Sequence, residues 1–110
     1  MKITEKENYK ILKDEKGDLV QFSNELTKKH SDLKKYNLVI DLLDFKNLGP
    51  EELLMFLEIA AIQVDHKKSF VIVKDNIEID KVPEDLIVVP TLREAEDVIN
   101  MDELQRELGL

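Results

Sequence analysis

Short, continuously apolar segments are the clearest pattern along this chain. Leu38–Leu43 and Ser69–Val73 are almost entirely apolar and rich in β-branched residues, and Asp85–Val89 repeats the pattern. Continuous apolar runs of this length are typical of strands buried on both faces of a mostly parallel sheet. We therefore expect three buried strands in the second two thirds of the chain.

The N-terminal part shows two other periodicities. Ile3, Tyr9 and Ile11 alternate with polar residues, which predicts one half-buried strand. From Leu19 to Lys34, apolar residues recur at helical spacing after a turn that ends at Asp18. Because an aspartate side chain can accept hydrogen bonds from the first backbone amides of a helix, we expect Asp18 to be the N-cap.

A second helix is expected to begin at Pro50 and to continue to about His66. Proline fits the first position of a helix, and the acidic residues Glu51 and Glu52 suit the positive end of the helix dipole.

The C-terminal quarter carries two capping-box patterns, Thr91–Glu94 and Asn100–Glu103. They predict two short helices, with residues 100–110 as a short helical extension. Residues 74–84 fit either a short helix or an irregular crossover.

Strands and helices alternate in the order of an α/β fold. We expect a small mixed, mostly parallel sheet with helices packed on it. At 110 residues the chain has the length of one domain, so residues 1–110 are interpreted as a single domain.

Composition narrows the possible functions. The net charge is −8, and the stretch from Glu84 to Leu110 holds eight acidic and two basic residues, so we expect no nucleic-acid partner. There is no cysteine, and the N-terminal MKITEKENYK lacks the apolar core of a signal peptide. We therefore expect a cytoplasmic protein that does not enter a membrane.

Catalytic and cofactor motifs are not recognisable. The glycines are isolated, which excludes a Walker loop and a dinucleotide fingerprint, and no serine has the flanking glycines of a nucleophile elbow. His30 lies on the apolar stripe of its helix and His66 near a helix end, so both are interpreted as structural or surface residues rather than metal ligands. We expect no enzyme activity, no metal and no cofactor.

Asp41 and Asp44 lie at the end of a predicted buried strand, where open α/β sheets often bind ligands. They could bind a cation, or line a site for a nucleotide or lipid. Alternatively, Asp41 accepts backbone hydrogen bonds in the following loop and Asp44 faces solvent.

The segment Leu53–Val64 predicts a helix with two apolar faces. At about 100° per residue, one face holds Leu53, Leu57, Ala60 and Val64, flanked by Phe56 and Ala61. Met55, Ile59 and Ile62 fall on the other face. That second face could be covered by Met101, Leu104 and Leu108, or by a partner protein or a second copy of the chain.

Residues 38–57 resemble the STAS domain, the fold of anti-sigma-factor antagonists. Members of that family have a buried strand ending in aspartate, like Val39-Ile40-Asp41-Leu42, then a loop, an amphipathic helix and another strand, like Phe70–Val73. A later strand leads into a helix, as in Ile87–Ala95. The resemblance covers about residues 5–99 and implies a bacterial regulatory domain that binds a protein.

The chain departs from the family at the start of this helix. Switching members carry a phosphorylatable serine there, whereas this chain has Asn47-Leu48-Gly49-Pro50-Glu51-Glu52, and between Ser31 and Ser69 it has neither serine nor threonine. Glu51 and Glu52 therefore supply a fixed negative charge where a phosphate would be added. The chain is also similar to short bacterial proteins labelled ribonuclease Z, but two isolated histidines cannot supply that enzyme's zinc motif.

From these observations we expect a non-enzymatic protein-binding domain. Its expected contact residues lie on the second helix and the loop before it: Leu48, Pro50, Glu51, Glu52, Met55, Ile59 and Ile62. The alternatives are a small-ligand module using Asp41 and Asp44, and a structural homodimer.

Overall fold

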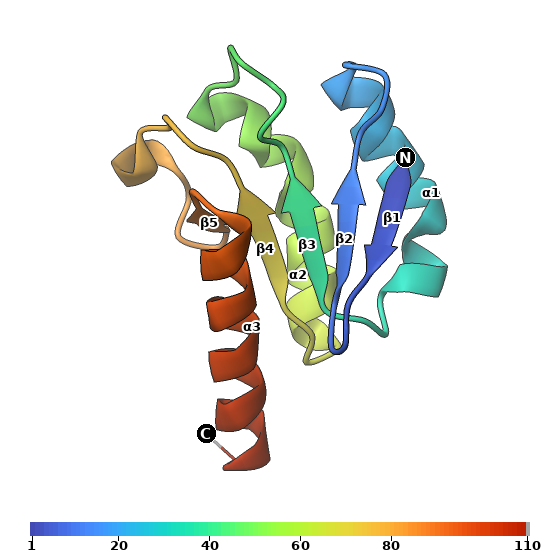
Figure 1. Cartoon of the computed structure of the whole chain (residues 1–110), viewed down its shortest axis with the longest axis vertical. Coiled ribbons are helices and arrows are strands. Elements are labelled where there is room, and N and C mark those ends of the chain that lie inside the picture. The colour runs from blue at the N-terminus through green and yellow to red at the C-terminus, as the bar shows by residue number, and fades with distance from the viewer. Residues whose placement is uncertain (110) are drawn as a thin grey trace.

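The computed structural model describes residues 1–109 and contains one five-stranded sheet with helices on both faces (Figure 1). The strands lie side by side in chain order: β1 (Lys2–Glu5), β2 (Lys10–Lys13), β3 (Leu38–Asp41), β4 (Phe70–Val73) and β5 (Ile87–Val89). β1 is antiparallel to β2, and all other neighbouring strands are parallel. The predicted α/β fold with a mixed, mostly parallel sheet is confirmed.

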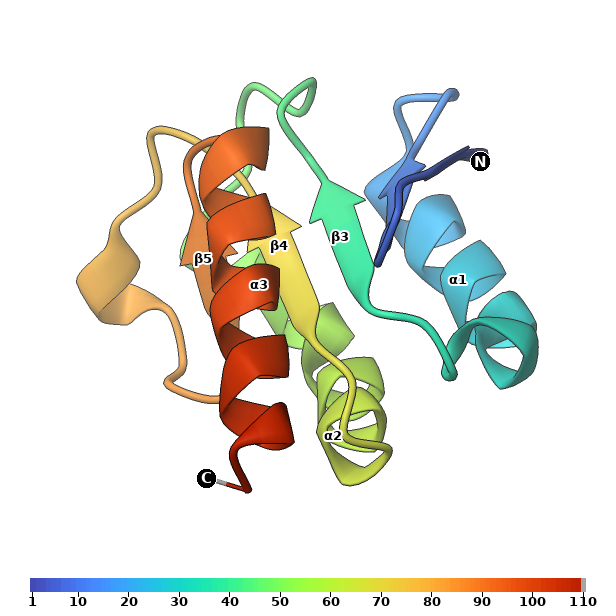
Figure 2. The same ribbon diagram turned by 60° about the horizontal axis from the view of Figure 1, so that its bottom comes forward.

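The connections place the helices in two layers. The helical elements are α1 (Leu19–Leu33), the 3-10 helix η1 (Pro50–Phe56), α2 (Leu57–Asp65), the short 3-10 helix η2 (Ile79–Lys81) and α3 (Leu92–Glu107). α1 and α2 cover one face of the sheet and α3 covers the other (Figures 1 and 2). None of the helices in residues 1–109 is long and apolar enough to cross a membrane.

The core has two layers because strand side chains alternate between the faces of the sheet. Leu12, Ile40 and Ile72 lie in the cluster formed with α1 and α2. Val39 and Val71 lie in the smaller cluster with Ala95 and Ile99 of α3. All residues of β3 and β4 are buried, which confirms the two buried strands predicted there.

Two strand predictions were wrong. The N-terminal pattern forms a hairpin instead of one strand, because the polar residues after β1 turn the chain and the Lys6 amide donates to the Tyr9 carbonyl at 2.9 Å. β5 is not buried on both faces. It pairs only with β4 at the edge of the sheet, and Ile87 is 45% exposed.

Local capping signals were predicted correctly. The Asp18 side chain accepts from the Gln21 amide at 3.0 Å, and the Thr91 hydroxyl accepts from the Glu94 amide at 3.1 Å. Pro50 is the first residue of η1.

α3 continues through Asn100, so the predicted break and the separate extension over residues 100–110 were wrong. The side chains that resembled a second capping box have another role. The Asn8 side-chain amide donates to Asn100 Oδ1 at 2.9 Å and to Glu103 Oε1 at 2.6 Å. These two residues therefore attach α3 to the turn between β1 and β2. Residue 110 lies outside the described part.

The second helix begins with 3-10 geometry, and this changes which residues it buries. A 3-10 helix has three residues per turn, so Leu53 and Phe56 share one face, and both are fully buried. α2 continues from that phase and buries Ile59, Ala60 and Gln63, whereas Val64 is 66% exposed. The prediction that Ile59 faces outward and Val64 inward was therefore wrong.

Candidate functional site

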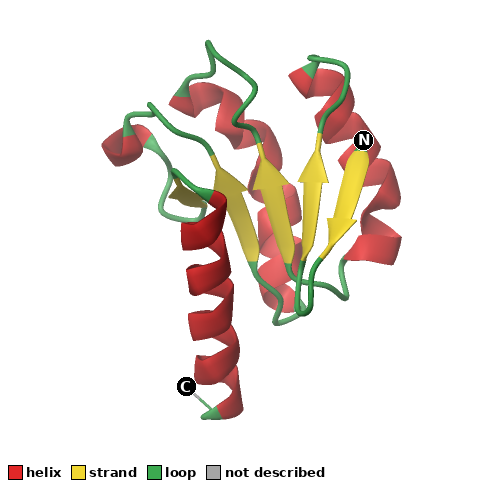
Figure 3. Cartoon of the chain, viewed as in Figure 1, coloured by secondary structure: helices red, strands yellow, loops and turns green. Residues whose placement is uncertain are grey.

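The loops that follow β2, β3 and β4 lie at the end of the sheet where the parallel strands terminate (Figure 3). Two adjoining clefts lie there. The first, of about 250 Å³, is lined by Asp14, Glu15, Gly17, Asp44 and Phe45. The second, of about 200 Å³, is lined by Gly17, Leu19, Phe45, Lys46, Asn47, Leu48 and Glu52. We call the two clefts together the strand-end groove.

Part of the predicted contact surface lies at this groove. Leu48 and Glu52 line it, although Leu48 is only 8% exposed. Pro50 and Met55 are half-buried on η1, and Glu51 is exposed.

Two residues of the predicted surface lie further along, on α2. Ile62 is half-buried, whereas Ile59 is 4% exposed and belongs to the core, so its predicted place on an outer face was wrong. Of the two alternatives for that face, cover by the C-terminal helix does not occur. Met101, Leu104 and Leu108 are at least half exposed, and α3 lies on the opposite face of the sheet (Figure 2).

The two predicted strand-end aspartates do not form a common site. Asp41 is 6% exposed, and its Oδ1 accepts a hydrogen bond from the Leu43 amide at 3.0 Å. Asp44 is exposed and forms an ion pair with Lys13 at 3.1 Å. The structure therefore agrees with the second alternative: Asp41 accepts a backbone hydrogen bond in the following loop, and Asp44 faces solvent. Only Asp44 lines the groove.

Other carboxylates around this edge are also engaged within the chain. Asp14 accepts from the Asp18 amide at 3.1 Å, and Glu52 accepts from the Gly49 amide at 3.1 Å. The hydrogen bond from Lys74, at 2.8 Å, holds the pKa of Asp75 below its usual value. Within residues 1–109 no three histidine or acidic side chains come together as metal ligands. The lining of the groove therefore consists of backbone, apolar and charged groups that can contact another molecule, without a cluster of metal ligands in the described residues.

His30 has the structural place that the sequence predicted. It is buried, and its Nε2 lies 2.8 Å from Gln63 Oε1. The Gln63 amide nitrogen donates to the Tyr36 carbonyl at 2.9 Å, so the amide oxygen faces His30. His30 must then donate from Nε2, because an amide oxygen only accepts. His66 also acts locally, with its Nδ1 2.8 Å from the Ile62 carbonyl at the end of α2.

The sequence did not predict a polar cluster at the opposite edge, where the parallel strands begin. There the Ser69 hydroxyl donates to Asp102 at 2.7 Å, and Arg106 donates to Ser69 Oγ at 3.0 Å. Asn37 and Ser69 both directly precede buried strands, and Arg106 is one of two bases in an acidic stretch. These were the available signals, but nothing in the sequence places residues 37, 69 and 106 together.

The fold defines the chain as an α/β domain built on a mixed, mostly parallel five-stranded sheet. No protein-family model matches its sequence, and no curated protein is similar enough to count as a relative.

Proposed function

We propose that this chain is a non-enzymatic domain that binds another protein through the strand-end groove and the adjoining η1. The observation that carries the proposal is the shape and lining of the groove. The groove is a pair of adjoining clefts of about 250 and 200 Å³, lined by apolar and charged side chains from two loops and from the starts of α1 and η1. A shallow surface with an aromatic side chain, Phe45, at its centre is better matched to a protein.

Exposed apolar side chains on η1 and α1, close in sequence to groove residues, support the proposal. Leu54, on η1 two residues beyond the groove residue Glu52, is 48% exposed, and Val20, next to the groove residue Leu19, is 60% exposed. Covering a large apolar side chain gains on the order of 1.5–3 kcal/mol. A partner that also covered these residues of η1 and α1 would therefore gain affinity beyond its contacts in the groove.

The resemblance to the STAS domain supports a regulatory role in a bacterial cytoplasm. The elements on which it rests occur in the required order: β3 ending at Asp41, a loop, η1 and α2, then β4, and finally β5 leading into α3. We propose that the partner contacts the loop before η1 and η1 itself, where that family is switched.

The proposed binding is not controlled by phosphorylation at this place, because residues 32–68 contain neither serine nor threonine. Glu51 and Glu52, which stand where the family carries its phosphorylatable serine, have different environments. Glu52 accepts from the Gly49 amide and so belongs to the start of η1, whereas Glu51 is exposed. We propose that Glu51 supplies the fixed charge that the partner meets.

Affinity capture from the native host tests the proposal. Leu54→Asp should abolish capture of a specific protein, and Glu51→Gln should weaken it about two- to fivefold, as expected for an exposed charge. Leu104→Asp is the matched control, because Leu104 is 50% exposed but lies on α3, across the sheet. Equal capture by all variants would contradict the proposal, and retention of full binding by Glu51→Gln would remove the fixed-charge part alone.

Light scattering distinguishes the homodimer alternative. A wild-type dimer that Leu54→Asp converts to a monomer would identify the partner as a second copy of the chain. A wild-type monomer would exclude the purely structural homodimer.

A further inference from the structure

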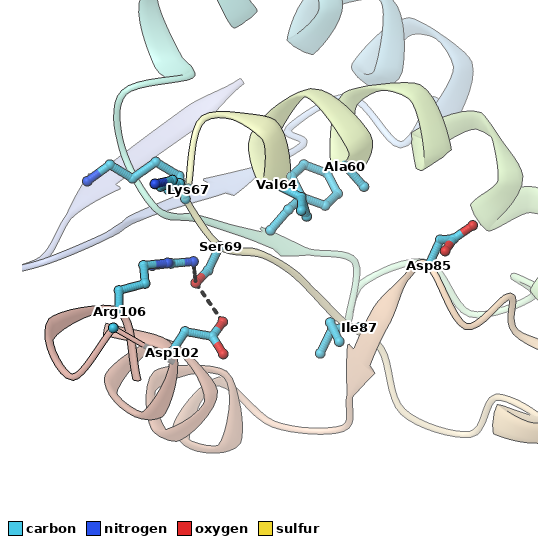
Figure 4. A pocket seen from close by; sticks show the side chains of 11 residues that line it. Ala60, Val64, Lys67, Ser69, Asp85, Ile87, Asp102 and Arg106 are labelled. Atoms are coloured by element: carbon cyan, nitrogen blue, oxygen red, sulfur yellow. Dashed lines mark hydrogen bonds between the residues drawn. The ribbon is translucent and has the colours of Figure 1, made fainter. Parts of the chain in front are cut away.

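Another cleft lies at the opposite end of the sheet from the groove, where the parallel strands begin. It is formed by the end of α2, the start of β4, β5 and the second half of α3, and it holds about 470 Å³ (Figure 4). This volume lies within the range of small-molecule sites. We call it the opposite-edge cleft.

One side of this cleft is mostly apolar, with Asp85 at its end away from Arg106 (Figure 4). Ala60 and Val64 of α2 lie above the hollow in Figure 4, and Ile87 of β5 lies below it. Val64 is 66% exposed and Ile87 is 45% exposed, although both are branched apolar residues. An apolar chain placed between them would remove both side chains from water.

The other end of the cleft is polar. Ser69 stands between Asp102 and Arg106, donating to the carboxylate at 2.7 Å and accepting from the guanidinium at 3.0 Å. Arg106 also donates from Nη1 to Asn37 Oδ1 at 3.5 Å. The guanidinium is thus held in place by neutral partners, and within residues 1–109 it makes no ion pair of 4 Å or less.

The charges around the cleft select the charge of an occupant. Lys67, Lys68 and Arg106 line it together with Asp85 and Asp102, so cations exceed anions by one. One surplus positive charge complements a monoanion. A guanidinium fork matches the geometry of a carboxylate, the simplest monoanion that can accept two parallel N–H bonds.

We propose that the opposite-edge cleft binds a small monocarboxylate with a short unbranched apolar chain. The carboxylate accepts from Arg106 beside Ser69, and the chain lies between Val64 and Ile87. This site is separate from the strand-end groove, and its occupant does not depend on the proposed protein partner.

Titration of the full chain with octanoate, followed by amide NMR, tests the proposal. Octanoate should shift the amides of Ser69, Ile87 and Arg106, while octanol and octylamine should bind at least about tenfold more weakly because they lack the negative charge. Absence of shifts at these amides, or equal binding of octanol, would overturn the proposal.

Substitutions test separately whether the polar and the apolar part of the cleft bind octanoate. Arg106→Gln should weaken octanoate about tenfold or more, whereas Arg93→Gln, which changes the other arginine of α3, should leave it unchanged. Because Arg106→Gln also removes contacts to Ser69 and Asn37, Ile87→Glu provides a second test that leaves the polar cluster intact. Ile87→Glu should abolish binding, and the exposed Ile79→Glu should not. Unaltered binding in both Arg106→Gln and Ile87→Glu would refute the site.

Discussion

Within residues 1–109, every side-chain nitrogen or oxygen that is fully shielded from solvent has a hydrogen-bond partner. Gln63 is fully buried and links α1 to the sheet edge, because its oxygen faces His30 and its nitrogen donates to the Tyr36 carbonyl. The sequence indicated that His30 was structural, since it lies on an apolar stripe. It could not identify the bond to Gln63, because 33 residues separate the two and only tertiary packing brings them together.

Gln63→Leu should therefore destabilise the fold even though it adds an apolar residue to the core. The substitution leaves His30 and the Tyr36 carbonyl without their partner, at a cost of about 1–3 kcal/mol in the free energy of unfolding. Urea unfolding measures this change, with the exposed Gln105→Leu as the control. A loss no larger than that of the control would mean that the network does not stabilise the fold.

A second residue-scale prediction concerns Tyr9. Burial raises its pKa above the usual value, and the charge of Glu96 and a hydrogen bond to it raise the pKa further. The neutral phenol is thus favoured in the folded state, so this contribution to stability is complete below about pH 10, the pKa in the unfolded chain. It is lost as the pH rises through the higher folded pKa.

Absorbance titration of the Tyr36→Phe variant follows Tyr9 alone, because the chain has two tyrosines. Glu96→Gln in that background should lower the midpoint. An unchanged midpoint would show that Glu96 does not act on Tyr9.

At the scale of elements, local signals predicted where helices begin, and packing decided their phase and length. Asp18, Pro50 and Thr91 act within one turn of their own positions, so their roles could be read directly. The 3-10 geometry of η1 could not, because it depends on how Leu53 and Phe56 fit the core.

The phase of α2 gives the element-scale prediction. Ile59→Ala should cost about 2–4 kcal/mol in the free energy of unfolding, because it opens a cavity beside buried neighbours. Val64→Ala, five residues further along the same helix, should change it by less than about 0.5 kcal/mol, since Val64 is 66% exposed. A larger loss of stability for Val64→Ala than for Ile59→Ala would contradict this prediction. It would mean that Val64 faces the core, as expected for a regular α-helix that begins at Pro50.

For the whole molecule, the α/β class followed from the order of elements, because three apolar runs separated by helical patterns leave few arrangements. The candidate sites were less predictable. Glu52 and Leu48 were found because they flank a helix start, whereas the opposite-edge cleft joins segments from residues 60 to 109 that only the fold assembles. The two edges of the sheet are thus proposed to serve different ligands: a protein where the strands end and a small carboxylate where they begin.

Hydrogen–deuterium exchange of the captured complex, compared with the free chain, tests whether a protein binds through the strand-end groove. We predict slower exchange in residues 44–56, which form the groove loop and η1, and little change in α3 away from the groove. Protection confined to α3, with exchange in residues 44–56 unaltered, would contradict it.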